Sequence, residues 1–186
     1  MTAAREPGGT AIGERIRTLV LENESADISA EVEALLFTAS RAQLVAEVVG
    51  PALARGDVVV VDRFVDSTLA YQWGGRGLPL ETLCAAQTLA TKGLEPDLKL
   101  LLDLPVQIGL GRRFADERQM DRIDRESREF HERVHAAYHT LAVSDPQRWR
   151  VIDASQSEAE VWSEVWRTVM EVEAGTTAIS RLSVDP

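Results

Sequence analysis

Hydrophobic residues recur every three or four positions along several stretches of the chain, which is the spacing of the buried face of an α-helix. The pattern predicts four longer helices, at residues 11–21, 31–53, 125–142 and 158–172, and two shorter ones, at residues 80–91 and 106–115. Residues 173–186 carry no such pattern. We therefore expect a folded domain over residues 1–172 and a flexible polar tail after it.

Three shorter apolar stretches predict β-strands, and each is followed by an aspartate. They are residues 58–61, 98–102 and 150–152. The first two are nearly continuous apolar runs, as in parallel strands that helices cover on both faces. Strands that alternate with helices predict an α/β fold with a parallel sheet. Three strands are few for so many helices, and residues 58–61 need a paired neighbour because an uncovered apolar edge promotes aggregation.

The bulk properties of the chain narrow its class. With 186 residues, of which 45 % are hydrophobic, it suits one folded domain. No apolar run approaches the roughly 20 residues that span a bilayer, so we expect no membrane partner. A formal net charge of −10 disfavours a binder of nucleic-acid polymers, since such proteins are usually basic. The single Cys84 cannot form an internal disulfide, and we expect a cytoplasmic protein.

Nearly all of the positive charge is carried by arginine, whose planar fork makes two parallel hydrogen bonds to a phosphate group. Arginines crowd residues 112–133, where acidic residues are interleaved with them. One interpretation is a solvated helix with ion pairs between neighbouring turns. The other is a lid, at about residues 112–125, whose arginines reach a phosphoryl group during its transfer.

Two short motifs lie where anions commonly bind. Residues 5–10 read Arg-Glu-Pro-Gly-Gly-Thr and form a tight turn before a predicted helix, whose N-terminus favours an anion. Asp62 and Arg63 follow a predicted buried strand, at the sheet edge outside which ligands sit in open α/β folds. Each motif also has a purely structural interpretation, as an ordinary loop-to-helix turn and as a strand-end ion pair.

Two further patterns combine aromatic or imidazole side chains at helical spacing. Phe37 and Arg41 share one helix face, where they either stack on and hydrogen-bond a base or simply form a core residue beside a surface arginine. His131, His135 and His139 recur at every fourth position, as metal ligands on a helix can. No acidic or cysteine ligands accompany them at a recognised spacing, so we do not expect a metal site there.

The order of the motifs is more specific than any one of them. The succession REPGGT at 5–10, LLFTASRAQ at 35–43, PALARG at 51–56 and VDRF at 61–64 resembles bacterial thymidylate kinases. So do DSTLAYQ at 66–72, LLDLP at 101–105, DRID at 121–124, FHERV at 130–134 and VIDA at 151–154. The resemblance covers residues 5 to about 172. It implies a three-layer P-loop kinase fold, phosphorylation of dTMP to dTDP by ATP with Mg²⁺ in dTTP biosynthesis, and a homodimer.

The resemblance also implies roles for single residues of the acceptor site. The residues that it places around dTMP are Glu6, Pro7, Arg17, Phe37, Arg41, Thr68, Tyr71 and Gln72. Phe37 would stack on thymine and Arg41 would hydrogen-bond the base. Thr68 and Gln72 would lie along the base edge, and Tyr71 would lie near the sugar. The other three would shape the floor of the site and reach in from the first helix.

For the phosphoryl group, the resemblance implies a catalytic set of arginines and one carboxylate. Arg63 would hold the dTMP phosphate close to the donor, and Asp62 would lie near the magnesium ion and its waters. Arg118 and Arg122 of the lid would contact the transferring phosphoryl group. Gln156 would border the adenine of ATP.

This sequence departs from the family pattern at its beginning. The family opens with a strand, a glycine-rich phosphate loop, a helix and a second strand, and the 186 residues contain no Gly-Lys followed by Ser or Thr. We therefore expect an N-terminally truncated or mis-started form in which the first strand–loop–helix unit is missing. The alternatives are a catalytically inactive nucleotide-binding remnant and a kinase for another nucleoside monophosphate.

Overall fold

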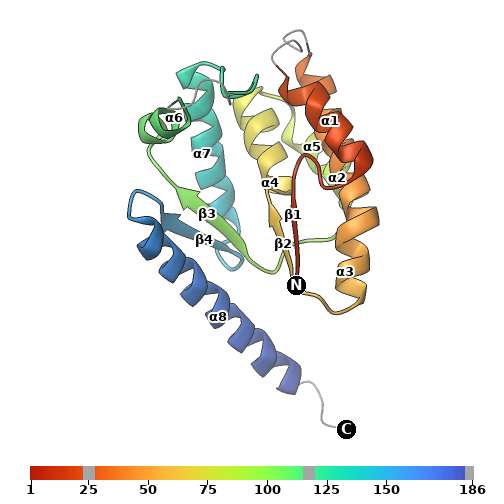
Figure 1. Cartoon of the computed structure of the whole chain (residues 1–186), viewed down its shortest axis with the longest axis vertical. Coiled ribbons are helices and arrows are strands. Elements are labelled where there is room, and N and C mark those ends of the chain that lie inside the picture. Colours follow the sequence, from red (N-terminus) through yellow and green to blue (C-terminus); the bar gives the residue numbers. More distant parts are fainter. Residues whose placement is uncertain (23–27, 115–119, 183–186) are drawn as a thin grey trace.

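The computed structural model describes residues 1–22, 28–114 and 120–182, with side chains as far as residue 172. Helices and short parallel strands alternate along it (Figure 1). In chain order the elements are β1 (Thr2–Arg5), α1 (Ala11–Leu21), α2 (Ala30–Leu44), the π-helical η2 (Val45–Val49), α3 (Gly50–Ala54), β2 (Val59–Asp62), α4 (Val65–Thr68), the π-helical η3 (Leu69–Gly75), α5 (Leu80–Thr91), β3 (Lys99–Asp103), α6 (Val106–Phe114), α7 (Arg128–Ser144), β4 (Trp149–Asp153) and α8 (Glu158–Leu182).

The strands form two parallel pairs. Strand β1 pairs with β2, with Thr2 opposite Val59, and β3 pairs with β4, with Lys99 opposite Trp149. The parallel α/β arrangement is therefore confirmed, but the described strands make two two-stranded sheets instead of the single covered sheet that we expected. One side chain of β2 and one of β3 remain half exposed: Val60 is 54 % exposed and Leu102 is 53 % exposed.

The helices agree with the hydrophobic pattern except over residues 65–75, where α4 and η3 form a helical run that the pattern did not predict. The helix predicted at 31–53 is a continuous run of α2, η2 and α3, and Pro51, which has no backbone N–H to donate, lies directly after the π-helical turn of η2. The pattern missed β1, because a four-residue strand of small and polar residues forms only through its pairing with β2. The prediction of an unstructured tail from residue 173 is wrong over ten residues, since α8 continues to Leu182 and projects beyond the rest of the fold in Figure 1.

Close contact between η3 and α7 forms the core that holds the candidate site. Its buried members are Ala70, Ile123, Phe130, Val134 and Ala137. Two glycines of η3 make the contact possible, because a Cβ atom on Gly74 would lie 2.4 Å from the Cβ of Ala137 and one on Gly75 would lie 2.5 Å from the ring of Phe130. A second cluster of Ala34, Leu69 and Leu83 joins α2, η3 and α5. Helix α2 and η3 are thereby fixed to each other, with their polar side chains between them.

Candidate functional site

The site begins where β1 and β2 end together. The backbone N–H of Glu6 donates to the carbonyl oxygen of Asp62 at 2.9 Å, which joins the loop after β1 to the last residue of β2. Asp62 is exposed at the carboxyl end of its strand. The next residue, Arg63, has a backbone φ of 67°, a left-handed conformation that non-glycine residues rarely adopt. Such backbone strain is concentrated at binding sites, where the surrounding structure enforces it.

Arg41 lies at the centre of a buried hydrogen-bond network. Its guanidinium pairs with Glu6 Oε2 at 2.5 Å, and it donates to Thr68 Oγ1 at 2.8 Å and to the carbonyl oxygen of Phe64 at 2.9 Å. It also donates to Gln87 Oε1 at 2.5 Å. Only 1 % of Arg41 is exposed, so these partners fix its orientation. Burial raises the pKa of Glu6, and the neighbouring guanidinium of Arg41 offsets part of that rise.

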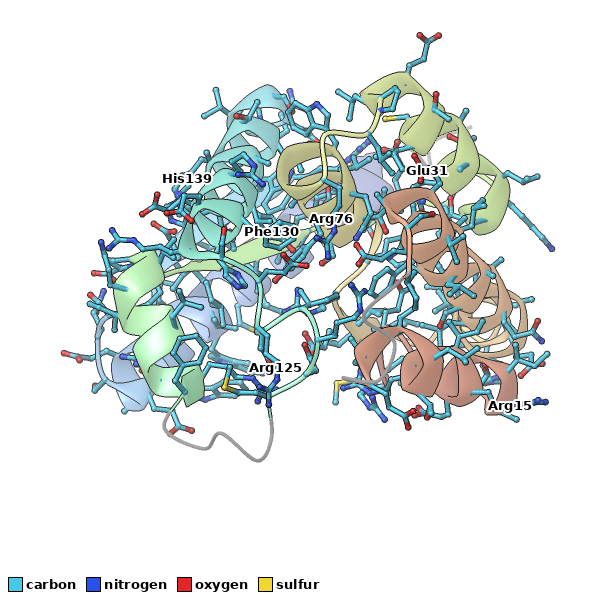
Figure 2. All side chains as sticks on the ribbon, turned by 90° about the horizontal axis from the view of Figure 1, so that it is seen from above. Arg15, Glu31, Arg76, Arg125, Phe130 and His139 are labelled. Carbon is cyan, nitrogen blue, oxygen red and sulfur yellow. The ribbon has the colours of Figure 1, made fainter. Side chains whose placement is uncertain are left out.

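Glu33 organises a second polar network one turn before Phe37 on α2. Its carboxylate accepts from Gln72 Nε2 at 2.8 Å and from Arg76 Nε and Nη2 at 3.1 and 2.9 Å. Arg122 Nη2 donates to the same carboxylate. Burial disfavours the charged carboxylate, but the hydrogen bonds from Arg76, Arg122 and Gln72 outweigh it and lower the pKa of Glu33. Figure 2 shows Arg76 beside Phe130, between the block that carries α7 and the block that carries α1 and α2.

Aromatic side chains come from the same two elements as these networks, Phe37 from α2 and Tyr71 from η3. Phe37 and Tyr71 both pack against the cluster that contains Phe130, and the rings of Tyr71 and Phe130 meet edge to face with centroids 6.1 Å apart. The guanidinium of Arg63 lies 5.4 Å from the centroid of the Tyr71 ring. Two aromatic side chains, an arginine and buried amide groups are the types of group that bind a base and a phosphate.

Three buried polar atoms at this site have no hydrogen-bond partner within the described part of the chain. They are Glu6 Oε1, Arg41 Nε and Gln72 Oε1. A buried polar group without a partner is destabilising by about 1–3 kcal/mol, so native proteins rarely keep several together without a ligand or water to satisfy them. The set contains one donor and two acceptors, which is complementary to a polar planar ligand.

Most of the residues that the sequence predicted for the acceptor site lie in these networks. Arg17 Nη1 donates to the carbonyl oxygen of Pro7 at 3.0 Å, so α1 does reach the loop after β1. Arg122 lies in the network but is already paired with Glu33, and its contact with a phosphoryl group stays a prediction. Gln156 is exposed in the turn between β4 and α8, apart from the two networks. Arg118 lies outside the described residues.

The sequence analysis missed several residues that hold the site together. Gln87 of α5 is 2 % exposed and connects Arg41 to Thr38, whose hydroxyl accepts from Gln87 Nε2 at 2.8 Å. Glu33 and Arg76 were missed as well. The sequence contained the same indication for Gln87 and Glu33. Each is a polar residue at an apolar position of a predicted helix, and a buried polar residue needs a hydrogen-bond partner.

The comparisons with known proteins agree with this geometry. A family model described as Thymidylate kinase matches residues 1–165. A curated thymidylate kinase from Thermomicrobium roseum is 51 % identical over 172 residues, which are 92 % of this chain and 81 % of the relative. The chain belongs to the thymidylate kinase family. This family comprises transferases that phosphorylate dTMP with ATP.

Other thymidylate kinases extend the likeness from sequence to structure. A curated thymidylate kinase from Lacticaseibacillus casei is 50 % identical over 167 residues, 89 % of this chain and 78 % of the relative. The crystal structure of thymidylate kinase from Ehrlichia chaffeensis superposes with a TM-score of 0.70 at 27 % identity, covering 90 % of this chain and 79 % of that one.

None of the described helices combines the length and the apolar character needed to cross a membrane.

Proposed function

We propose that this chain binds dTMP between α2 and η3 and phosphorylates it with ATP. The observation that carries the proposal is the pair of unsatisfied buried atoms, Arg41 Nε and Gln72 Oε1, beside the rings of Phe37 and Tyr71. Thymine has an N–H that donates to an acceptor and carbonyl oxygens that accept from a donor. Gln72 Oε1 and Arg41 Nε supply that acceptor and that donor.

In the proposed complex the base lies against Phe37, which stacks on its face. Thr68 and Gln72 lie along the base edge, and Tyr71 lies near the sugar. Arg41 is held by Thr68 and its other buried partners, so it meets the base without first losing side-chain freedom. This preorganisation favours a ligand whose hydrogen-bonding pattern matches that of the site. A ligand with a different pattern would leave buried polar groups of the site unpaired.

The phosphate of dTMP extends in this proposal toward the ends of β1 and β2. Arg63 holds it, while Glu6, Pro7 and Arg17 shape the floor of the site. The carboxylate of Asp62 is exposed at the strand end and is the type of ligand that holds Mg²⁺ through its waters, together with substrate phosphates. Mg²⁺ would supply charge neutralisation for the transferring group, and lid residues Arg118 and Arg122 would add to it.

The donor side is less complete in this sequence. The 186 residues contain no Gly-Lys-Ser or Gly-Lys-Thr, the motif whose backbone and lysine hold the phosphates of ATP. Gln156 remains the residue proposed to border adenine. Acceptor binding and phosphoryl transfer are therefore tested separately.

The first experiment titrates dTMP into the 186-residue chain by calorimetry, without ATP. We expect saturable binding, and binding of dCMP weaker by at least about 100-fold, because the ring N3 of cytosine is an acceptor that would oppose Gln72 Oε1. Phe37→Ala should weaken dTMP binding by roughly 10–100-fold, since stacking of a base is worth about 1–3 kcal/mol. Trp162→Ala is the matched control, because Trp162 lies on α8 and is 63 % exposed.

The second experiment measures ADP formation with dTMP and Mg²⁺ATP. Absence of dTMP binding in the first experiment would overturn the acceptor site. Binding of dTMP without ADP formation would keep the acceptor site and overturn phosphoryl transfer by this chain. Preference for another nucleoside monophosphate would overturn the assignment of thymine as the base.

We further propose that the chain acts as a homodimer in the cytoplasm. Exposed apolar side chains on α2 support an interface, with Val32 and Leu35 exposed by 47 % and 64 %. The 186 residues contain a single cysteine, Cys84, so the described fold uses no internal disulfide, which suits a reducing compartment. Light scattering on a size-exclusion column gives the mass of the particle, and a monomer at micromolar concentration would contradict the dimer.

A further inference from the structure

Outside the proposed acceptor site, the fold brings one carboxylate and two imidazoles together. Asp103 is the last residue of β3, and His135 and His139 are one turn apart on α7. Asp103 Oδ1 lies 2.8 Å from His135 Nε2 and 3.0 Å from His139 Nε2. Figure 2 shows His139 on the side of α7 that faces away from Arg76 and the acceptor site. Asp103 is 32 residues from His135 and 36 residues from His139 in the chain, so only tertiary packing brings the carboxylate to the two imidazoles.

The geometry of the three groups is close to that of a metal centre. One ligand atom from each residue lies within 4.8 Å of the others, and the two imidazole rings have centroids 4.6 Å apart. With metal–ligand bonds of about 2.0–2.2 Å, neighbouring ligand atoms of a tetrahedral site are about 3.3–3.5 Å apart. The two separations from Asp103 are therefore within about 0.7 Å of those in a tetrahedral site. Two histidines at positions i and i+4 of a helix recur as two of the protein ligands of zinc sites.

The surroundings of the cluster also suit an exchangeable ion. The side chains of Asp103, His135 and His139 are 28 %, 37 % and 39 % exposed, so an ion can enter from solvent and water can occupy a remaining coordination position. Without an ion, the two ring nitrogens share a single carboxylate oxygen. An ion at their meeting point would bind both imidazoles and the carboxylate through lone pairs.

We propose that Asp103, His135 and His139 form a binding site for a divalent transition-metal ion, with Zn²⁺ as its representative. Two imidazoles and one carboxylate match the ligand preference of Zn²⁺ and its transition-metal neighbours, whereas Mg²⁺ and Ca²⁺ prefer oxygen ligands. Three protein ligands leave one position open to water. This site is separate from Asp62 and does not depend on the proposed kinase activity. The bound ion would fasten the carboxyl end of β3 to α7.

The test is a titration of ZnCl₂ into the untagged 186-residue chain after removal of metals with a chelator. We expect one ion per chain and a rise in the thermal midpoint with added Zn²⁺. Asp103→Asn, His135→Gln and His139→Gln should each weaken binding by at least about tenfold, since even residues that only support metal ligands cost 10–100-fold. Excess Mg²⁺ should not displace the Zn²⁺.

The matched control is His131→Gln, because His131 lies on the same helix but packs its ring against Phe130 and is absent from the cluster. Its Zn²⁺ affinity should equal that of the unmodified chain. Circular dichroism melts without metal establish that each variant folds. The Zn²⁺ titration of the unmodified chain tests the proposal without any variant. The proposal is overturned by lack of saturable 1:1 binding, by retained affinity in a His135→Gln/His139→Gln double variant, or by equal loss in His131→Gln.

Discussion

Replacing Glu33 by glutamine tests the polar network that links α2 to η3. Glu33 is 1 % exposed, and its carboxylate accepts four hydrogen bonds from Gln72, Arg76 and Arg122, two on each oxygen. Glutamine keeps the shape of the side chain but presents an NH₂ group in place of one oxygen. Whichever way the amide is turned, two of the four donors then face another donor.

The expected cost follows from those two lost bonds. A hydrogen bond to a charged group contributes about 1.5–3 kcal/mol, and breaking a buried ion pair by removing one partner costs about 3–5 kcal/mol. We therefore expect Glu33→Gln to lower the free energy of unfolding by about 3–5 kcal/mol at neutral pH. For a chain of this size each kcal/mol lowers the thermal midpoint by about 2–4 °C, so the midpoint should fall by roughly 10 °C.

The effect should also depend on pH. The pKa of Glu33 is lowered from its ordinary value of 4.5 in the folded chain, so its stabilising contribution is present above that pH. The contribution is lost as the pH falls through the lowered pKa, because the carboxylate is then protonated in the folded chain as well. The difference in stability between the unmodified chain and Glu33→Gln should accordingly shrink on acidification below about 4.5.

Urea unfolding followed by circular dichroism measures these differences. The matched control is Glu132→Gln, which removes an exposed pair with Arg128 whose Nε and Oε1 atoms are 2.7 Å apart. It should cost less than about 0.5 kcal/mol, as exposed pairs one helical turn apart do. A loss below about 1 kcal/mol for Glu33→Gln at neutral pH, or a loss that does not change on acidification, would refute the argument that its charge balances two buried arginines.

Three further predictions address other parts of the structure. Gln87→Leu should weaken dTMP binding by about tenfold, because Arg41 then loses a buried partner; calorimetry that finds unchanged affinity would make Gln87 a purely structural residue. Arg63→Ala should weaken binding of dTMP by about 10–100-fold and that of thymidine by less than about threefold, and equal losses for both ligands would contradict a phosphate contact. Gly74→Ala should destabilise the fold by about 1–3 kcal/mol in urea unfolding, whereas Gly111→Ala, which meets no atom within 4 Å, should be neutral or stabilising.

The contacts of η3 show why part of the candidate site could not be predicted. The motif at residues 66–72 identified Thr68, Tyr71 and Gln72 by resemblance, but no local pattern indicates that Glu33 and Arg76 would meet beside Gln72. Gly74 and Gly75, directly before Arg76, lie against α7, and small residues give no hydrophobic signal of their own. Gln87 was missed for a related reason, since its partners Thr38 and Arg41 lie on another helix.

The sequence by itself predicted the helices outside residues 65–75, three of the four described strands and the family, and the family resemblance named most of the residues that we propose for the acceptor site. Helical and strand periodicities are local, because each follows from which side chains one element buries. Strand β1 was not determined in this way, since only its pairing with β2 makes a strand of residues 2–5. Neither was the meeting of Asp103 with His135 and His139. Sequence spacing showed three histidines, His131, His135 and His139, without an acidic partner. Only the packing of α7 across the end of β3 supplied the carboxylate, because side chains far apart in the chain become neighbours through tertiary contacts alone.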